Sequence, residues 1–230
     1  MSNKAIIKIG HRGAKGYIAE NTLESFAKAM ELGIDAIELD VQVCKSGELV
    51  VFHDHRVERL TNGIGRIEDL EYKYLKKLDA GNGAIIPTLE QVLDLIDNKV
   101  IVNIELKSKN SAKEVAKLTE LYINKHNWKK TNFLISSFDH IELLQFKKLS
   151  PEINIGALTA SIPTNYALFA ENLGAYSINI SLEFTNQAYV DDAHKRGLKV
   201  FVYTVNHPKD IAICKAMGVD GIFSDFPDRL

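Results

Sequence analysis

The sequence predicts a (β/α)8 barrel, and three observations lead to that fold class. Short β-branched runs alternate with amphipathic helical stretches along the whole chain. Alternation of this kind implies parallel strands joined by right-handed crossovers. The runs that can pair in parallel come to eight, the number that closes such a barrel.

Each predicted strand is a short apolar run, and each predicted helix has apolar residues at helical spacing. The predicted barrel strands are 5–9, 36–43, 100–105, 133–136, 155–158, 176–180, 199–205 and 221–224. The predicted helices are 22–32, 88–96, 111–125, 141–149, 165–173, 186–196 and 208–217. Asn21 or Thr22 can cap the first helix, and Pro208 suits a helix start.

One stretch interrupts this alternation. A short strand at 49–52 follows the Ser46-Gly47 turn and extends the sheet near the second strand. Residues 54–87 are too many for a simple loop, so we expect a small insertion over the barrel mouth, with one helix near 70–78. An open doubly wound sheet is the rival fold, but no glycine-rich phosphate loop follows the first strand.

The composition is ordinary for a soluble globular protein, and the length allows one large domain or two small ones; from the barrel pattern we expect a single domain spanning residues 1–230. The net charge of −2 provides no basic field for nucleic acid or an anionic membrane. No apolar run approaches membrane-spanning length, and the first four residues lead straight into a strand without a signal-peptide core. A cytoplasmic protein without stable membrane insertion is therefore expected, with Cys44 and Cys214 as buried packing residues. The oligomeric state is left open.

Three carboxylates fall at the ends of neighbouring predicted strands. Glu38 and Asp40 are two residues apart, so their side chains point to the same face. Burying both in mid-strand would be costly, whereas at the carboxyl end of the strand they can share a cation. Glu105 ends the next full strand. Three such oxygen ligands suit one divalent cation, Mg²⁺ or Ca²⁺, rather than zinc. Alternatively, Glu38 or Asp40 faces solvent or pairs with a basic side chain.

Two histidines also follow strands directly. His11 comes after the first strand and His53 after the short strand, and both titrate near neutrality, which suits acid–base catalysis. A lone histidine more often has a structural role, and that role is expected for His55, His126, His140, His194 and His207.

Arg12 and Lys107 are the candidate groups for binding an anion. The guanidinium of Arg12 matches the geometry of a phosphate. Lys107 lies two residues after Glu105 and shares its face if the strand continues; alternatively it only balances the carboxylates. Gly13 permits a backbone geometry or a close approach that a side chain would block.

These segments together resemble the glycerophosphodiester phosphodiesterase family. The matching segments run in family order along essentially the whole chain, so the ordered set is highly specific although each motif alone is weak. They are His11-Arg12-Gly13, Glu20-Asn21-Thr22-Leu23, Ile37-Glu38-Leu39-Asp40-Val41, Val51-Phe52-His53-Asp54, Asn103-Ile104-Glu105-Leu106-Lys107, Ser136-Ser137-Phe138, Tyr203-Thr204-Val205-Asn206 and Gly218-Val219-Asp220-Gly221-Ile222-Phe223-Ser224-Asp225.

The resemblance implies a TIM barrel with a small insertion after the second strand. It also implies hydrolysis of a glycerophosphodiester to sn-glycerol 3-phosphate and an alcohol. A metal would be held by Glu38, Asp40 and Glu105, and His11 and His53 would act as base and acid respectively. Water or the neighbouring glycerol hydroxyl can supply the attacking oxygen.

The resemblance further places Arg12 and Lys107 near the phosphate. The family usually has Trp where this chain has Tyr203, a residue expected to line the pocket, so the preferred alcohol is less certain than the reaction. Smaller departures are Ala19 in place of Pro and Ser46-Gly47 in place of Asp-Gly.

Two other functions compete with this one. A lysophospholipase D or sphingomyelinase D-like phosphodiesterase would need an apolar surface for a lipid tail, for which Ile64, Phe138 and Phe184 are candidates. A non-catalytic phosphodiester-binding protein is the more remote alternative, because it would not require both histidines and all three acids.

Overall fold

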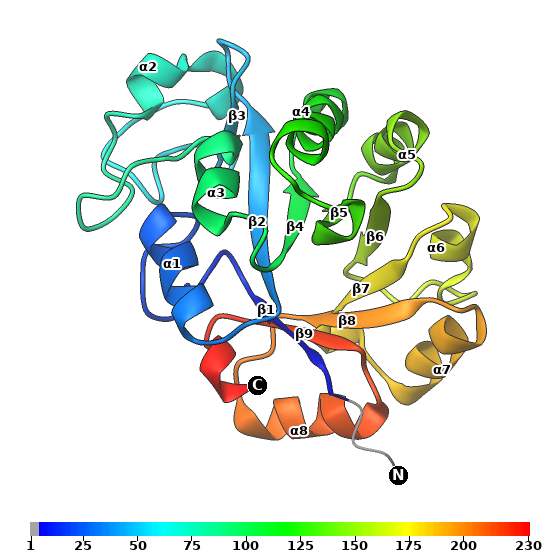
Figure 1. The fold of residues 1–230 in the computed structure, drawn as a ribbon. Coiled ribbons are helices and arrows are strands. Elements are labelled where there is room, and N and C mark those ends of the chain that lie inside the picture. The colour runs from blue at the N-terminus through cyan, green and yellow to red at the C-terminus, as the bar shows by residue number, and fades with distance from the viewer. Residues whose placement is uncertain (1–4) are drawn as a thin grey trace.

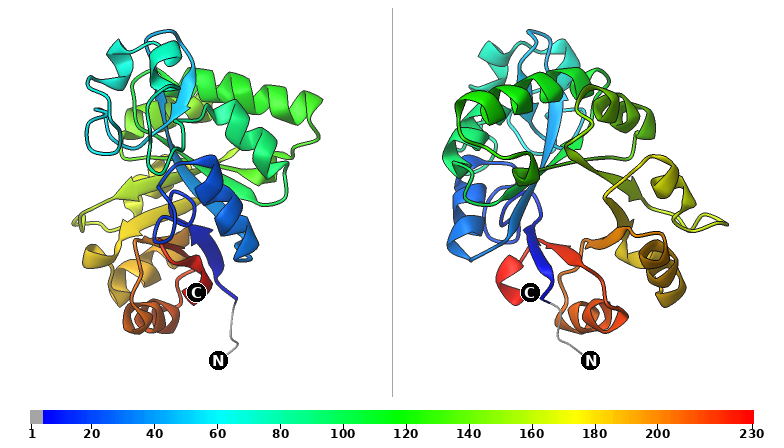
Figure 2. Two further views of the ribbon diagram at one scale, coloured as in Figure 1. Left: turned by 90° about the vertical axis from the view of Figure 1, so that its left-hand side faces the viewer. Right: turned by 45° about the vertical axis from the view of Figure 1, so that its right-hand side comes forward.

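A computed structural model describes residues 5–230 and shows a closed barrel of eight parallel strands with helices around it (Figures 1 and 2). The strands follow the order β1-β9-β8-β7-β6-β5-β4-β2, and pairing of β1 with β2 closes the barrel. The predicted TIM barrel is therefore confirmed, and the open sheet is excluded. The barrel strands are β1 (Ile7–Gly10), β2 (Ala36–Val43), β4 (Ile101–Leu106), β5 (Phe133–Ser137), β6 (Asn154–Thr159), β7 (Ser177–Ser181), β8 (Lys199–Tyr203) and β9 (Gly221–Ser224).

The register of the strands aligns their carboxyl ends at one rim. Asp40 on β2 is paired with Glu105 on β4, one strand pair from the point of closure. On the other side of the closure, Gly10 at the end of β1 is paired with Ile37 on β2 and with Ser224 on β9. Side chains that follow β1, β2, β4 and β9 are thus brought together although they are far apart in sequence.

The helices occupy the positions that the sequence predicts. They are α1 (Leu23–Glu31), α3 (Leu89–Ile96), α4 (Ser111–Lys125), α5 (His140–Leu149), α6 (Leu168–Asn172), α7 (Gln187–Lys195) and α8 (Pro208–Met217). Thr22 is the residue that caps α1, because its side chain accepts a hydrogen bond from the Ser25 amide. The alternative cap, Asn21, turns toward Asp40 instead.

The apolar core of the barrel has two parts. The larger part lies between the barrel wall and the helices, and it contains buried side chains from every barrel strand except β1. The smaller part groups Ile9, Ala36, Leu134, Phe201 and Phe223 on the barrel strands themselves. Cys44 and Cys214 are buried and free, as their predicted packing role requires. Polar groups on β2 and β4 therefore project from a rigid apolar support.

The insertion packs as a small unit beside β2 and β3. Strand β3 (Leu49–Val51) pairs antiparallel with β2, and residues 54–87 follow it with a single-turn helix α2 (Tyr72–Leu75) (Figure 1). The predicted helix at 70–78 is shorter than expected: a separate turn at Ile67–Asp69 ends at Leu70, and the amides of Lys77 and Leu78 bond three residues back instead of four. A separate apolar cluster that includes Val57 and Ile67 anchors the insertion.

Within the described part of the chain, no helix is both long and apolar enough to cross a membrane. The expectation that a signal peptide is absent rests on residues 1–4, which lie outside the described residues.

Candidate active site at the carboxyl ends of the strands

A cavity of about 260 Å³ opens at the strand ends and collects most of the predicted site residues. It is lined by His11, Arg12, Glu38, His53, Asn103, Glu105, Lys107, Phe138, Leu158, Tyr203, Thr204 and Phe223. None of these lining residues comes from 54–87, so the insertion stands beside this cavity rather than across it. Asp40 is absent from the lining but adjoins it beneath Arg12 and Lys107.

The three predicted carboxylates form one compact buried cluster. One oxygen from each of Glu38, Asp40 and Glu105 lies within 4.8 Å of the others. Glu38 and Asp40 project from β2, and Glu105 projects from the paired position on β4. Among the described residues, Oδ1 of Asp40 finds no hydrogen-bond partner. A buried carboxylate oxygen without a hydrogen bond is costly, and a cation among these three groups would satisfy it.

The electrostatics of this cluster reflect crowding of like charges. Burial, together with the charges of Asp40 and Glu105, raises the pKa of Glu38 well above its usual value. Burial and the Asp40 charge raise the pKa of Glu105 to about 7. Burial also opposes ionisation of Asp40, yet Arg12, His53 and Lys107 hold its pKa below the ordinary value. The cluster therefore needs added positive charge before all three groups can ionise together.

Arg12 lies between the carboxylates and the cavity. Its amide donates to Glu38 at 2.8 Å, its Nη1 donates to Glu20 at 2.6 Å, and its Nε is 3.4 Å from Asp40. The residue has a φ of 51°, and Gly13 follows with a φ of 86°. A Cβ on Gly13 would lie 2.4 Å from Oγ of Ser25, so this tight turn requires glycine.

Lys107 approaches the same cluster from the end of β4. Its Nζ donates to Glu105 at 2.8 Å and lies 3.8 Å from Asp40. Burial disfavours the charged ammonium, but Glu105 and Asp40 keep the Lys107 pKa above its ordinary value. Lys107 therefore balances the carboxylates and lines the cavity at the same time.

His11 is held at the cavity by the last strand of the barrel. Its Nδ1 lies 2.6 Å from Asp225, which follows β9, and Asn206 donates to the other oxygen of Asp225 at 2.8 Å. The His11 side chain is only 13% exposed. Burial lowers the pKa of His11, and the bond with Asp225 opposes that shift. Because Nδ1 is engaged by the carboxylate, Nε2 is the nitrogen left for proton transfer.

His53 has a matching partner but a more open setting. Its Nδ1 lies 2.7 Å from the neighbouring Asp54, and its side chain is 30% exposed. Burial lowers the pKa of His53, whereas the charge of Asp40 raises it. Arg59 of the insertion donates to both oxygens of Asp54, at 2.5 and 2.8 Å. Both histidines thus carry an aspartate on Nδ1 and line one cavity.

Where β8 lines the cavity, the wall is made of aromatic side chains. The hydroxyl of Tyr203 donates to the Thr159 carbonyl at 2.8 Å, and its ring meets Phe138 edge-on at 5.9 Å. Phe138 is 46% exposed at this rim. Of the other residues proposed for a lipid surface, Ile64 is exposed on the insertion away from the lining, and Phe184 packs against the core. Only Phe138 of the three adjoins the cavity.

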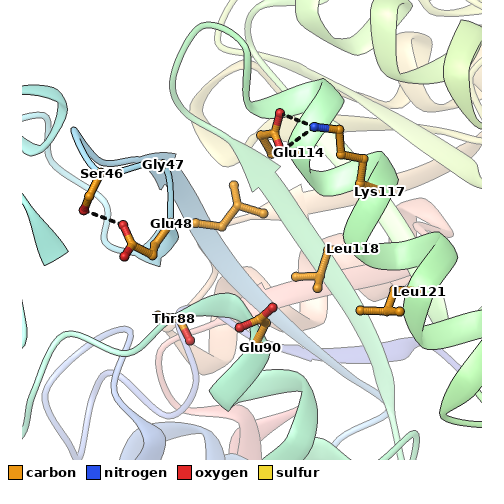
Figure 3. Close-up of a pocket in the computed structure, with 10 residues that line it drawn as sticks. Ser46, Gly47, Glu48, Thr88, Glu90, Glu114, Lys117, Leu118 and Leu121 are labelled. Carbon is orange, nitrogen blue, oxygen red and sulfur yellow. Dashed lines mark hydrogen bonds and ion pairs between the residues drawn. The ribbon is translucent and has the colours of Figure 1, made fainter.

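A larger hollow of about 500 Å³ lies elsewhere, between the β2–β3 turn and helices α3 and α4 (Figure 3). Three of its charged groups are engaged locally, because Ser46 donates to Glu48 and Lys117 donates to Glu114. Leu118 and Leu121 provide apolar surface in the same hollow. It brings together neither histidines nor the carboxylate cluster, so the smaller cavity is the candidate active site.

The structure adds residues that sequence reasoning did not single out. Asp225, Asn206, Asp54, Glu20 and Arg59 all bond to predicted site residues or to their partners. Asp54 could have been found from its position next to His53, and Glu20 and Asp225 lie in the family-like segments. Arg59 had no such signal. The other five histidines have local partners, in agreement with their expected structural role: His55 bonds Gln42, His140 bonds a carbonyl, His194 bonds Asp220, His207 caps α8, and His126 stacks on Tyr122.

Comparison with known proteins identifies the family. The model described as the glycerophosphoryl diester phosphodiesterase family matches residues 11–229. A glycerophosphodiester phosphodiesterase of Caldanaerobacter subterraneus is 38% identical over 235 residues, covering 96% of this chain and 95% of that protein. A human lysophospholipase D is 27% identical over 265 residues, covering 96% of this chain and 84% of that protein.

A solved structure agrees with these sequence matches. A phosphodiesterase of Oleispira antarctica, in complex with the product sn-glycerol-3-phosphate, superposes with a TM-score of 0.89 at 32% identity and covers 96% of this chain and 93% of that one. The resemblance drawn from the motifs is thereby confirmed, and this chain belongs to the glycerophosphoryl diester phosphodiesterase family.

Proposed function

We propose that this protein hydrolyses glycerophosphodiesters to sn-glycerol 3-phosphate and an alcohol. The observation that carries the proposal is the pair of aspartate-bound histidines on one cavity beside three buried carboxylates. The product complex of the Oleispira antarctica relative supports the substrate class.

The residues present fit a divalent cation. The three carboxylates offer hard oxygen ligands, and Oδ1 of Asp40 has no hydrogen bond and only a distant ion pair with Lys107, which leaves it available to a cation. Glu38, Asp40 and Glu105 would hold Mg²⁺ or Ca²⁺, which when bound would neutralise a phosphodiester and polarise its P–O bonds.

Proton transfer falls to the two histidines. His11 acts as the base, because burial lowers its pKa and favours the neutral ring that can accept a proton at Nε2. His53 acts as the acid, since its side chain is 30% exposed and this open position admits the leaving alcohol. Protonation by His53 would let an alkoxide of high pKa depart.

Arg12 and Lys107 bind the phosphate oxygens. Both cations line the cavity, and both already bridge to the carboxylate cluster through Asp40. Negative charge that develops on the phosphoryl oxygens would be stabilised by these fixed donors. Tyr203 lines the same cavity and bounds the space for the substrate.

A coupled assay for glycerol 3-phosphate tests the proposal. We expect turnover of several glycerophosphodiesters, complete loss of activity with EDTA, and recovery on addition of Mg²⁺ or Ca²⁺. Calorimetric titration of the metal-free protein with either ion should show one site, which Asp40→Asn weakens. Full activity after thorough chelation would reject the carboxylate metal site, and absence of glycerol 3-phosphate from every diester would reject the function.

A lysophospholipase D activity is the second candidate. The human relative and the exposed Phe138 at the rim favour it, because an apolar rim can support an acyl chain. Turnover of lysophosphatidylcholine relative to glycerophosphocholine separates the two candidates. A higher kcat/KM for the lysolipid, reduced by Phe138→Ser, would favour the second.

A further inference from the structure

We propose that Arg59 of the insertion is a positioning residue. It links Asp54, the partner of His53, to Glu20, the partner of Arg12. This inference rests on the proposed function and assigns a role to the insertion, which contributes no lining residue to the cavity.

The bonds of Arg59 carry the proposal. Its Nε and Nη2 donate to the two oxygens of Asp54, the carboxylate that holds Nδ1 of His53. The same Nη2 donates at 3.1 Å to Glu20. Glu20 accepts at 2.6 Å from Nη1 of Arg12, on the same oxygen. One guanidinium therefore connects the partner of the proposed acid with the partner of the proposed phosphate ligand.

Burial distinguishes this network from an ordinary surface ion pair. Glu20 is 6% exposed, and Arg12 is 12% exposed, although Arg59 itself is 50% exposed. A bidentate guanidinium–carboxylate pair has a fixed geometry, so it restrains the orientation of Asp54 and through it the ring of His53. A lysine could not satisfy both acids with the same planar geometry.

The insertion is built to present this side chain. Val57 is fully buried in the apolar cluster of the insertion, and its carbonyl accepts from the amide and hydroxyl of Thr61. This turn places Arg59 over Asp54 and Glu20, which are 5 and 39 residues away in sequence. The insertion beside the cavity therefore positions Arg59 against the two acids that hold site residues.

Arg56 provides a matched control. It lies three residues earlier in the same insertion, is 56% exposed, and pairs with Glu58. It has the same charge and similar exposure, but its paired acid is not a partner of His53 or Arg12. Removal of Arg56 tests whether any lost arginine on this segment disturbs the enzyme.

The experiment compares kcat and KM of full-length wild-type protein, Arg59→Ala, Arg59→Lys and Arg56→Ala, with saturating Mg²⁺ or Ca²⁺. For sn-glycero-3-phosphocholine we expect Arg59→Ala to lose about 10- to 100-fold in kcat/KM, Arg59→Lys to lose less, and Arg56→Ala to stay within about twofold. Thermal midpoints should be similar across the set.

A second substrate separates positioning from general structural damage. Because His53 is proposed to protonate the leaving group, the loss in kcat should be several-fold smaller for a diester that releases p-nitrophenol, which leaves as a stable anion. A merely structural role would lower both rates alike. Combining Arg59→Ala with Asp54→Asn should cost less than the product of the separate losses.

Activity of Arg59→Ala within about twofold of wild type, an equal loss in Arg56→Ala, or equal losses on both substrates would overturn the positioning role. If Arg59→Ala does not fold, wild-type rates in Arg59→Lys would overturn it, because lysine cannot reproduce the planar bidentate pair with Asp54. Failure of the proposed function is separate, since the wild-type protein itself would then release no glycerol 3-phosphate.

Discussion

The two histidines of the site have the same partner type in very different surroundings. His11 is 13% exposed and bonds an aspartate that comes from the opposite end of the chain, 214 residues away. His53 is 30% exposed and bonds the next residue along. The barrel closure holds the first pair, whereas the insertion holds the second through Arg59. A rigid and a more accessible histidine on one cavity suit two different proton-transfer roles.

The largest expected effect is removal of either ring. We expect His11→Ala and His53→Ala each to lower kcat by roughly 10²–10⁴-fold, with the fold intact, because each loses one proton-transfer step. The coupled assay measures kcat, and circular dichroism checks that the fold is intact. His126→Ala is the control, since that ring stacks on Tyr122. Near-normal turnover in either site variant would remove the corresponding histidine from the mechanism.

The next effect compares the two aspartates. Asp225→Asn and Asp54→Asn keep the shape but remove the charge that orients each ring, and we expect losses of about 10- to 100-fold in kcat. The loss should be greater for Asp225→Asn, because the buried His11 ring has less solvent to replace its partner. A larger loss in Asp54→Asn would contradict the expectation that the more buried histidine depends more strongly on its aspartate.

A pH profile sharpens the same contrast. Since a base must be neutral, kcat/KM should rise with pH through the pKa of His11, and burial places that midpoint below the ordinary value for histidine. Asp225→Asn removes the interaction that favours the charged ring, so the midpoint should move to still lower pH. A shift to higher pH would contradict a neutral His11 held by Asp225.

The smallest expected effect is at Tyr203, on the wall that β8 provides. Tyr203→Phe removes the hydrogen bond to the Thr159 carbonyl but keeps the ring that contacts Phe138. We expect a change of about two- to fivefold in kcat/KM, with the pH profile unaltered. A displaced pH profile would show that this wall influences a histidine, and relative rates across alcohol groups would report its part in specificity.

Local patterns in the sequence were sufficient for the barrel and for most of the predicted site. The alternation of strands and helices predicts parallel pairing, and the spacing of Glu38 and Asp40 places both carboxylates on one face of β2. His11, His53 and Glu105 are at or just after strand ends, which meet at one rim in a closed parallel barrel. The prediction was less accurate for the helix at 70–78, where only Tyr72–Leu75 is helical and the following amides bond three residues back instead of four.

Only the tertiary structure decided which side chains meet across the chain. Asn21 looked like a helix cap, but barrel closure brings it to Asp40, which it bonds at 2.9 Å. Asp225 reaches His11, and Arg59 reaches Glu20, because loops from distant segments converge at one rim. Periodicity and spacing describe neighbours along a strand or helix, whereas these contacts depend on how the ends of the barrel come together. The sequence by itself therefore determined the barrel and the residue types at its rim, and the fold decided which partners orient them.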